Sequence, residues 1–153
     1  MQPAIALALL ALLIGIALVL LLRFQVMRMR RRLMRKIEMR FPETEVLKLD
    51  LSANLFGVRS RGHKQIRGTG GLVLTHQYLY FLRAVPEKEF AVPLQTIQQV
   101  DHPQQFLGKS IFYPLLRVTY TLDGKEEEIA WAVRQPEAWR AAITQAMTYI
   151  KSG

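Results

Sequence analysis

AIALALLALLIGIALVLLL, residues 4–22, is a run of nineteen residues without a charged or polar side chain. A helix of nineteen residues is about 28 Å long, which matches the hydrocarbon core of a bilayer. A helix that is apolar on every face is out of place on the surface of a small soluble protein. The run therefore predicts a transmembrane helix over residues 1–22.

The flanks of this run distinguish a membrane anchor from a secretory signal. A secretory signal carries positive charge before its apolar core and small residues at a cleavage site after it. Residues 1–3 carry no side-chain charge, and residues 23–25 show no such cleavage pattern. Positive charge lies after the run, so the positive-inside rule places the N-terminus outside and the rest of the chain in the cytoplasm. We expect a single-pass protein of the cell (inner or plasma) membrane.

A basic segment follows the apolar run. Residues 23–40 hold eight Lys or Arg and one Glu, whereas residues 41–153 hold thirteen basic and eleven acidic residues. The excess charge therefore lies beside the membrane, where each Lys or Arg contributes about 1 kcal/mol of attraction to anionic lipid. The simpler interpretation is a topology signal alone. The juxtamembrane basic residues are Arg23, Arg28, Arg30, Arg31, Arg32, Arg35, Lys36 and Arg40.

The same segment carries a narrow apolar stripe. Its members recur every three or four residues, which predicts that the helix continues through residues 23–42, either along the membrane or as a stalk. Pro42 predicts the end of that helix at or near Arg40. The stripe consists of Val26, Met29, Leu33, Ile37 and Phe41.

The net charge of +9 would also suit a nucleic-acid-binding protein. No basic strand with interleaved aromatic residues occurs, so nucleic acid is not an expected partner. Within the apolar run, small side chains share one helix face, a spacing that lets two membrane helices pack closely. Chance explains this pattern as well. The alternative is homo-oligomerisation through the transmembrane helix, or packing of that helix against a membrane partner. These helix-packing residues are Ala4, Ala8, Ala11 and Gly15.

The pattern changes to a period of two after Glu43. Leu47, Leu49 and Leu51 alternate with polar residues, which predicts a half-buried strand. A glycine-rich stretch over residues 57–71 predicts tight turns or bulges between short strands. Further strands are expected at residues 72–74, 78–82, 89–92, 96–100, 115–121 and 125–133, with Asp123-Gly124 as the turn of the last hairpin.

The last part of the chain predicts an amphipathic helix. Pro136 suits its first position and Glu137 suits the positive end of its dipole. Short strands followed by one such helix are typical of a strongly bent antiparallel sheet or barrel closed by the helix, a mainly β class of α+β fold. Residues 43–153 suffice for one core and not for two. The apolar face of the helix holds Trp139, Ala142, Ile143, Ala146, Met147 and Ile150.

Three runs within residues 45–150 carry a family resemblance: GTGGLVLTHQYLYFL, FAVPLQTIQQV and LLRVTYTLDGKEEEIAWAV. Together with the final helix they resemble GRAM/PH-like domains. The resemblance implies seven strands in a strongly bent sheet, with Trp139 as a core plug. The layout also resembles bacterial membrane-anchored proteins of unassigned function. The matching positions are Leu72, Leu74, Thr75, Leu79, Phe81, Val92, Pro93, Leu94 and Ile97.

No residue pattern points to catalysis. His63, His76 and His102 are isolated, without the spacing of metal ligands. No serine stands in a G-x-S-x-G setting, and no GKS or GKT follows the glycines. We therefore expect no enzymatic activity, no metal and no cofactor. The acidic run at residues 126–128 reads as a solvated strand edge that discourages association with another sheet.

One basic constellation lies in the glycine-rich connection. Arg59, Arg61, Lys64 and Arg67 place four cations in nine residues. In PH domains a basic early loop grips phosphoinositide head groups, so the resemblance implies a lipid- or phosphate-binding role for these side chains. The simpler interpretation is a basic solvated loop near an acidic membrane.

Two functions fit these features. The first is a membrane-anchored binding module at the cytoplasmic face that docks lipid head groups or a partner protein. The alternative is a purely structural protein–protein adaptor anchored in the membrane. The expected partners are therefore the anionic lipid surface and another membrane or peripheral protein.

Overall fold

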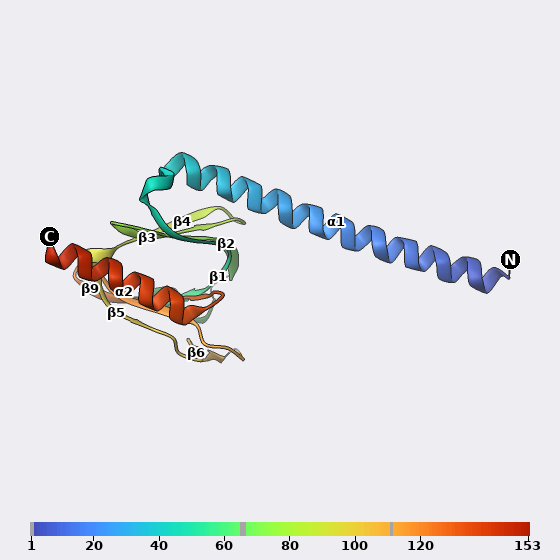
Figure 1. Ribbon diagram of the computed structural model, residues 1–153. Coiled ribbons are helices and arrows are strands. Elements are labelled where there is room, and N and C mark those ends of the chain that lie inside the picture. Colours follow the sequence, from blue (N-terminus) through green and yellow to red (C-terminus); the bar gives the residue numbers. More distant parts are fainter. Residues whose placement is uncertain (1, 65–66, 111) are drawn as a thin grey trace. The chain divides into compact units, whose positions relative to one another are not determined.

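The computed structural model describes residues 2–64, 67–110 and 112–153, with the backbone alone at residues 63 and 64. The chain forms two compact units that divide between Arg32 and Leu33. In chain order (Figure 1) the elements are α1 (Pro3–Arg40), η1 (Glu43–Glu45), β1 (Val46–Val58), η2 (Arg59–Lys64), β2 (Gly68–Thr75), β3 (Tyr78–Arg83), β4 (Lys88–Pro93), η3 (Leu94–Thr96), β5 (Ile97–Asp101), β6 (Gln105–Phe106), β7 (Lys109–Ser110), β8 (Leu116–Leu122), β9 (Lys125–Ala132) and α2 (Pro136–Ser152).

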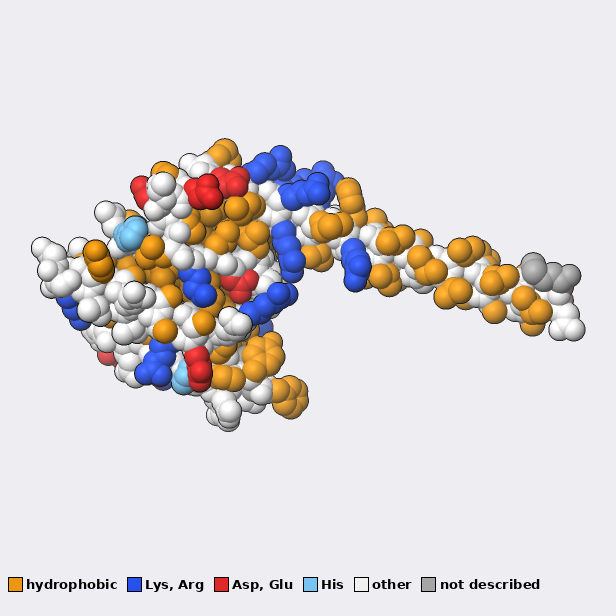
Figure 2. Space-filling model, in the orientation of Figure 1, with side chains coloured by type: hydrophobic (Ala, Val, Ile, Leu, Met, Phe, Trp, Pro, Cys, Tyr) orange, Lys and Arg blue, Asp and Glu red, His pale blue; other side chains and the backbone are white. Residues whose placement is uncertain are grey.

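Helix α1 contains both the apolar run and the basic segment. Its most apolar window has a mean hydropathy of 3.3 and no buried residue, so α1 is long and apolar enough to cross a membrane. The helix ends at Arg40, two residues before Pro42, because a proline disfavours helical backbone in the residue before it. The continuation of the helix through the basic segment is thus confirmed. Figure 2 shows Lys and Arg side chains along its later turns.

Seven strands form one antiparallel sheet in the order β4-β3-β2-β1-β9-β8-β5. Strand β1 is central because it pairs with β2 from Val46 to Leu55 and with β9 from Asn54 to Val58. Register shifts within both pairings mark bulges, which allow a strand to bend. The expected antiparallel sheet with a C-terminal helix is confirmed. The barrel alternative is wrong, because β4 and β5 stay unjoined edges of the described sheet.

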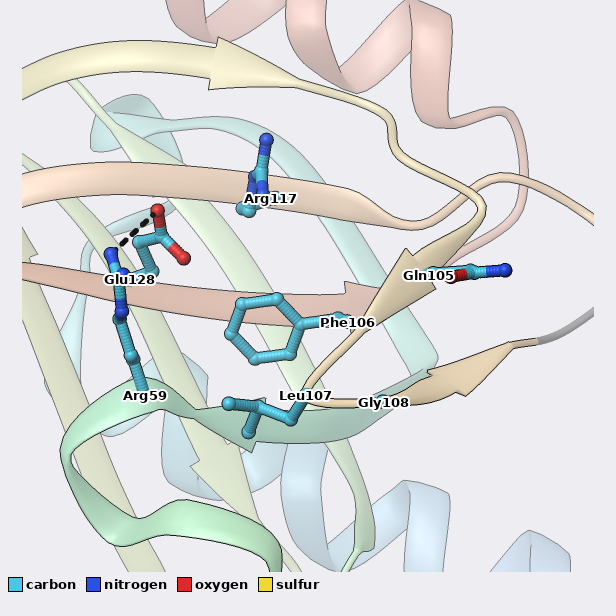
Figure 3. Close-up of a pocket in the computed structure, with 7 residues that line it drawn as sticks. All are labelled: Arg59, Gln105, Phe106, Leu107, Gly108, Arg117 and Glu128. Carbon is cyan, nitrogen blue, oxygen red and sulfur yellow. Dashed lines mark ion pairs between the residues drawn. The ribbon is translucent and has the colours of Figure 1, made fainter.

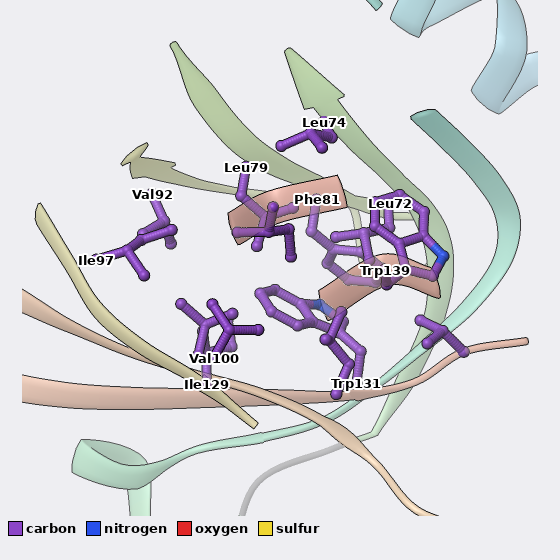
Figure 4. Close-up of a cluster of buried hydrophobic side chains, with 14 of the residues drawn as sticks. Leu72, Leu74, Leu79, Phe81, Val92, Ile97, Val100, Ile129, Trp131 and Trp139 are labelled. Carbon is purple, nitrogen blue, oxygen red and sulfur yellow. The ribbon is translucent and has the colours of Figure 1, made fainter. Parts of the chain in front are cut away.

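The main core lies between the two halves of the sheet and α2 (Figure 4). Alternate residues of β2 and β3, such as Leu72 and Phe81, point into it, as period-two strands require. The Phe81 and Trp131 rings lie 6.1 Å apart. Trp139 of α2 is 1% exposed in this core, so its expected place as a core plug is confirmed.

The opposite face of β2 and β3 is covered as well. Leu33, Ile37 and Phe41, the last three members of the apolar stripe, are buried in the second compact unit. The Phe41 ring meets the Tyr80 ring edge-on, with centroids 5.0 Å apart. The final turns of α1 therefore belong to the domain, and the compact unit begins at Leu33. The sequence-based division at residues 22 and 42 remains a prediction.

Polar contacts surround this helix end. Lys36 forms an ion pair with Glu87, which lies between β3 and β4. Burial raises the pKa of the Tyr80 phenol, and its hydrogen bond to the Glu89 carboxylate raises that pKa further. The phenol donates this hydrogen bond to Glu89 beside its apolar contact with Phe41.

Glycines in β2 make this packing possible. A Cβ at Gly71 would lie 2.6 Å from Cδ1 of Ile37, and a Cβ at Gly70 would lie 2.1 Å from the backbone oxygen of Leu82. Glycines at 68, 70 and 71 were expected in tight turns or bulges between short strands. They lie within the paired strand β2, and the pairing with β1 has a register shift between Asp50 and Ala53, where Asp50 pairs with Leu72 and Ala53 with Gly70. Close approach of a helix and a neighbouring strand, not a change of chain direction, requires them.

Two further expectations concern the hairpin of β8 and β9. Asp123 and Gly124 have φ of 49° and 75°, so the predicted two-residue turn between β8 and β9 is confirmed. The acidic run at residues 126–128 was expected on a sheet edge, and this is wrong. It lies in β9, which has β1 on one side and β8 on the other.

A small hairpin that the sequence did not predict covers part of the outer face. Strands β6 and β7 pair through a turn at Leu107 and Gly108, with φ of 51° and 70°. Phe106 is buried in a second cluster with Phe56 and Leu115, and Leu107 packs against it. Leucine rarely adopts positive φ, so this packing holds the turn in a conformation that the residue itself disfavours.

The fit between Ile37 and Gly71 gives a test by double-mutant cycle. Gly71→Ala should destabilise the domain by about 1–3 kcal/mol through overpacking, and Ile37→Val by roughly 0.5–1.5 kcal/mol. Together they should cost less than the sum, because valine lacks the Cδ1 that meets the new methyl group. Thermal unfolding of the full chain in detergent, followed by fluorescence of the buried tryptophans, measures each term.

Ile143→Val is the matched control for this cycle. Ile143 is equally buried but lies on α2 in the main core, so its combination with Gly71→Ala should be additive. Additivity at Ile37 as well would show that α1 does not pack on Gly71 in solution.

Candidate functional site

The structure places the four residues of the basic constellation in different surroundings. Arg59 lies beside β9, where its Nη1 is 3.2 Å from Oε1 of Glu128 and 3.8 Å from Oε1 of Glu126. The Arg61 guanidinium lies 5.7 Å from the centroid of the Phe90 ring. Lys64 has its side chain outside the described residues.

Arg67 stacks on a different hydrophobic cluster from Arg61. Its guanidinium carbon is 4.0 Å from the centroid of Phe56, which belongs to the outer cluster under the β6–β7 hairpin. Phe90, the ring beneath Arg61, packs instead against the main core. Cation–π contacts of this kind stabilise exposed guanidinium groups in place. The three described arginines thus each take a separate neighbour.

A hollow of about 270 Å³ opens between η2, the β6–β7 hairpin and the start of β8 (Figure 3). Arg117 enters it from β8 and Arg59 from η2, with Glu128 between them. Arg117 also pairs with Asp101 through two hydrogen bonds, one of 2.8 Å from Nε to Oδ1. That pair raises the pKa of the Arg117 guanidinium. The hollow is lined by Arg59, Gln105, Phe106, Leu107, Gly108, Arg117 and Glu128.

Carboxylates of the same chain compensate the charges around this hollow. The pairs join two guanidinium groups to Asp101, Glu126 and Glu128. The neighbouring Glu127 is 7% exposed and accepts a hydrogen bond of 3.1 Å from the Ser60 N–H. A phosphate entering the hollow would have to replace carboxylates that already occupy guanidinium donors. The arrangement ties η2 to β9 and β8, and it opposes anion binding at Arg59.

A second, larger hollow of about 660 Å³ runs along α2. Its α2 residues fall at helical spacings on one face, and His102, next after edge strand β5, closes it. His102 Nε2 lies 3.6 Å from Oε1 of Glu137. Both charges, hydroxyls and an amide line the groove, a mixture suited to a polypeptide segment. We call it the α2 groove, lined by His102, Glu137, Arg140, Ala141, Thr144, Gln145 and Thr148.

Sequence reasoning missed the α2 groove. The polar residues of α2 recur with helical period opposite the apolar face. This pattern predicts an exposed helix face, but it does not predict a groove. Its other wall depends on the placement of β5, which no local pattern reveals. Among the described residues, no three His, Cys, Asp or Glu side chains come together as a metal site requires.

Two exposed aromatic residues were also missed. Phe112 is fully exposed and Tyr113 is 56% exposed, in the segment between β7 and β8. The N–H of Leu115 donates a hydrogen bond of 2.7 Å to the Pro103 carbonyl, which closes the base of this excursion. An aromatic run between strands ordinarily indicates core, so nothing in the sequence marked these side chains as exposed.

The remaining candidate residues lie on α1. The eight juxtamembrane basic residues are all exposed. Two of them contact the compact domain, through the Lys36–Glu87 ion pair and a stacking of Arg40 on Phe41 at 5.8 Å. The small residues Ala4, Ala8, Ala11 and Gly15 are exposed along the apolar run, and their role in helix packing remains a prediction.

Comparison with known proteins supports the fold alone. No family model and no curated protein matches the chain. A chain in the solved structure of the 8S snRNP assembly intermediate is similar in fold, with a TM-score of 0.55 and 12% sequence identity. The match covers 70% of this chain and 85% of the other.

The charge compensation at Arg59 makes a prediction for anion binding. Glu128→Gln should raise the affinity of the full chain for inorganic phosphate, because it releases guanidinium donors of Arg59. Glu137→Gln removes the same charge on α2 and should leave the affinity unchanged. Titration calorimetry in detergent compares the variants, and the juxtamembrane arginines contribute equally to all of them. An equal rise in both variants would indicate a non-specific charge effect.

Proposed function

We propose that this chain is a membrane-anchored binding module with a PH/GRAM-like domain at the cytoplasmic face, and that the domain docks a partner protein. One observation carries the proposal. A helix that contains an apolar stretch of membrane-spanning length ends as a buried part of the sheet domain, with Leu33 and Ile37 in its interface. The domain is therefore tied covalently, at short range, to the anchor.

The charge pattern supports the orientation of the anchor. The eight basic residues that follow the apolar run favour retention of that side in the cytoplasm. Their attraction to anionic lipid adds to the hydrophobic anchor, since such segments gain energy near acidic head groups. The face of small residues on the apolar run would allow two copies of the helix to pack together, so the module could act as a homo-oligomer.

The sheet supports the PH/GRAM-like assignment. Seven antiparallel strands, a long central β1 shared between both halves, and a C-terminal helix with a buried Trp139 agree with what the resemblance implies.

The surroundings of the basic residues favour a protein over a lipid head group as the ligand. Specific recognition of a phosphorylated head group requires several cations that converge on one phosphate cluster. Arg59 is paired with two carboxylates, and Arg61 and Arg67 stack on separate rings. The α2 groove, beside the unjoined edge of β5, offers mixed polar groups and a strand edge to an extended segment.

Topology is tested by cysteine labelling, because the native chain has no cysteine. In intact cells or spheroplasts, an impermeant thiol reagent should label Gln2→Cys and spare Ser152→Cys. Both should react once the membrane is permeabilised. Labelling of Ser152→Cys before permeabilisation would place the domain outside and refute the proposed orientation.

Docking is tested by filling the α2 groove. Ala141→Trp places a large side chain in the groove without touching the core, whereas Tyr149→Trp adds an indole elsewhere on exposed α2. Crosslinking in native membranes should yield a partner adduct with the native chain and with Tyr149→Trp, and lose it with Ala141→Trp.

A lipid ligand would give the opposite result. Arg59→Ala, Arg61→Ala, Lys64→Ala and Arg67→Ala in one chain should leave the partner adduct intact. If that variant instead loses discrimination among vesicles of equal charge but different phosphorylated head groups, the module reads lipid and the protein-docking proposal is wrong.

A further inference from the structure

We propose that the exposed aromatic pair Phe112 and Tyr113 inserts into the head-group region of the bilayer, as a second membrane contact of the domain. The inference rests on the proposed function in one respect, because it requires that α1 anchor the chain in that bilayer. The lipid-facing surface would lie between β7 and β8, in a segment separate from α1.

The aromatic pair is presented by a built structure. The excursion between Pro103 and Leu115 is closed at its base by the hydrogen bond of 2.7 Å between them. Within it, Phe106 is buried and Leu107 packs on the outer cluster, so the β6–β7 hairpin is held against the sheet. Phe112 and Tyr113 follow that hairpin and stay outside the cluster. In Figure 2 hydrophobic side chains protrude near the place where Figure 1 labels β6.

The exposure of these side chains is unfavourable in water. A fully exposed phenylalanine beside a half-exposed tyrosine leaves large apolar surface hydrated, while the excursion also holds buried positions such as Phe106. An aromatic ring with a polar tip suits the membrane interface, where tyrosines gather. A bilayer surface therefore removes the hydration cost without a shaped protein partner.

Positive charge accompanies the aromatic pair. Lys109 is exposed on β7, three residues before Phe112. Arg67 lies on the Phe56 ring, which shares a cluster with Phe106 of the hairpin. Cations around a protruding aromatic tip favour an anionic lipid surface, since each contributes attraction near acidic head groups. The arginine that was expected to grip phosphate thus lies at the cluster that the hairpin covers.

The chain itself keeps the domain that carries the tip near the membrane. Ten residues, 23–32, separate the apolar run from Leu33. Even fully extended they span at most roughly 35 Å, so the domain begins within that distance of the bilayer whatever its orientation. Such a short tether gives the tip a high effective concentration at the lipid surface, and a contact too weak to bind a free protein suffices.

Tryptophan reporters in the full chain test the contact. Phe112→Trp is conservative at an exposed position, and Tyr113→Trp provides a second reporter should the first disturb the fold. Each variant is reconstituted in phosphatidylcholine–phosphatidylglycerol vesicles with and without brominated acyl chains. The native Trp131 and Trp139 are buried and give a common background, which the native chain measures. We expect a blue-shifted emission from the introduced indole that brominated lipid quenches and that aqueous iodide does not.

Two matched reporters separate the possible failures. Leu13→Trp lies in the apolar run, and Tyr149→Trp lies on exposed α2. Brominated lipid should quench the first, and iodide should quench the second in outward-facing molecules. If Leu13→Trp is quenched by lipid but both loop reporters are quenched only by iodide, the second contact is refuted and the anchor stands. A partner protein is then the remaining occupant of the tip.

Failure of the anchor gives a different pattern. If brominated lipid does not quench Leu13→Trp, the apolar run is not in the bilayer, and both the proposed function and this inference are wrong. Replacing Lys109 by Gln in the Phe112→Trp chain should reduce the lipid quenching at low salt and have less effect at high salt, since salt screens the attraction.

Discussion

The structure depends on the need to cover β2 and β3 on both faces. Residues of these strands that face the main core, such as Phe81, alternate with others that face outward, such as Tyr80, and both sets are buried. Buried strands of this kind need a layer on each side. The sheet and α2 supply one layer, and the last turns of α1 supply the other. The end of α1 is thereby a structural part of the domain.

Local sequence patterns predicted much of the fold, but they did not predict features that depend on contacts between residues distant in sequence. The end of α1 before Pro42 and the turn at Asp123-Gly124 depend on backbone restrictions that two or three residues determine. The glycines of β2 were expected in turns or bulges, and their role in the close approach of Ile37 was not predicted because that approach leaves no local pattern in the sequence. The acidic run was misassigned to an edge because only the strand order shows that β1 flanks β9.

The candidate sites divide in the same way. Composition located the basic constellation, but charge compensation at Arg59 comes from Glu126 and Glu128, which are distant in sequence. Residue type indicates which ligand a side chain could bind, but the neighbouring side chains decide whether its charge is already paired within the protein. The α2 groove and the aromatic tip at Phe112 were not predicted, since each forms only after the β5 edge and the β6–β7 hairpin are placed.

The double pairing of β1 has a consequence for synthesis of the chain. Its pairing with β2 joins residues close in sequence, but its pairing with β9 must wait until Ala132 has left the ribosome. Until then the inner faces of β2 and β3 lack their cover, and exposed apolar strands are prone to association. If α1 anchors the chain in a membrane, as we propose, the residues made first hold such a nascent domain at the membrane and limit its encounters with other nascent chains.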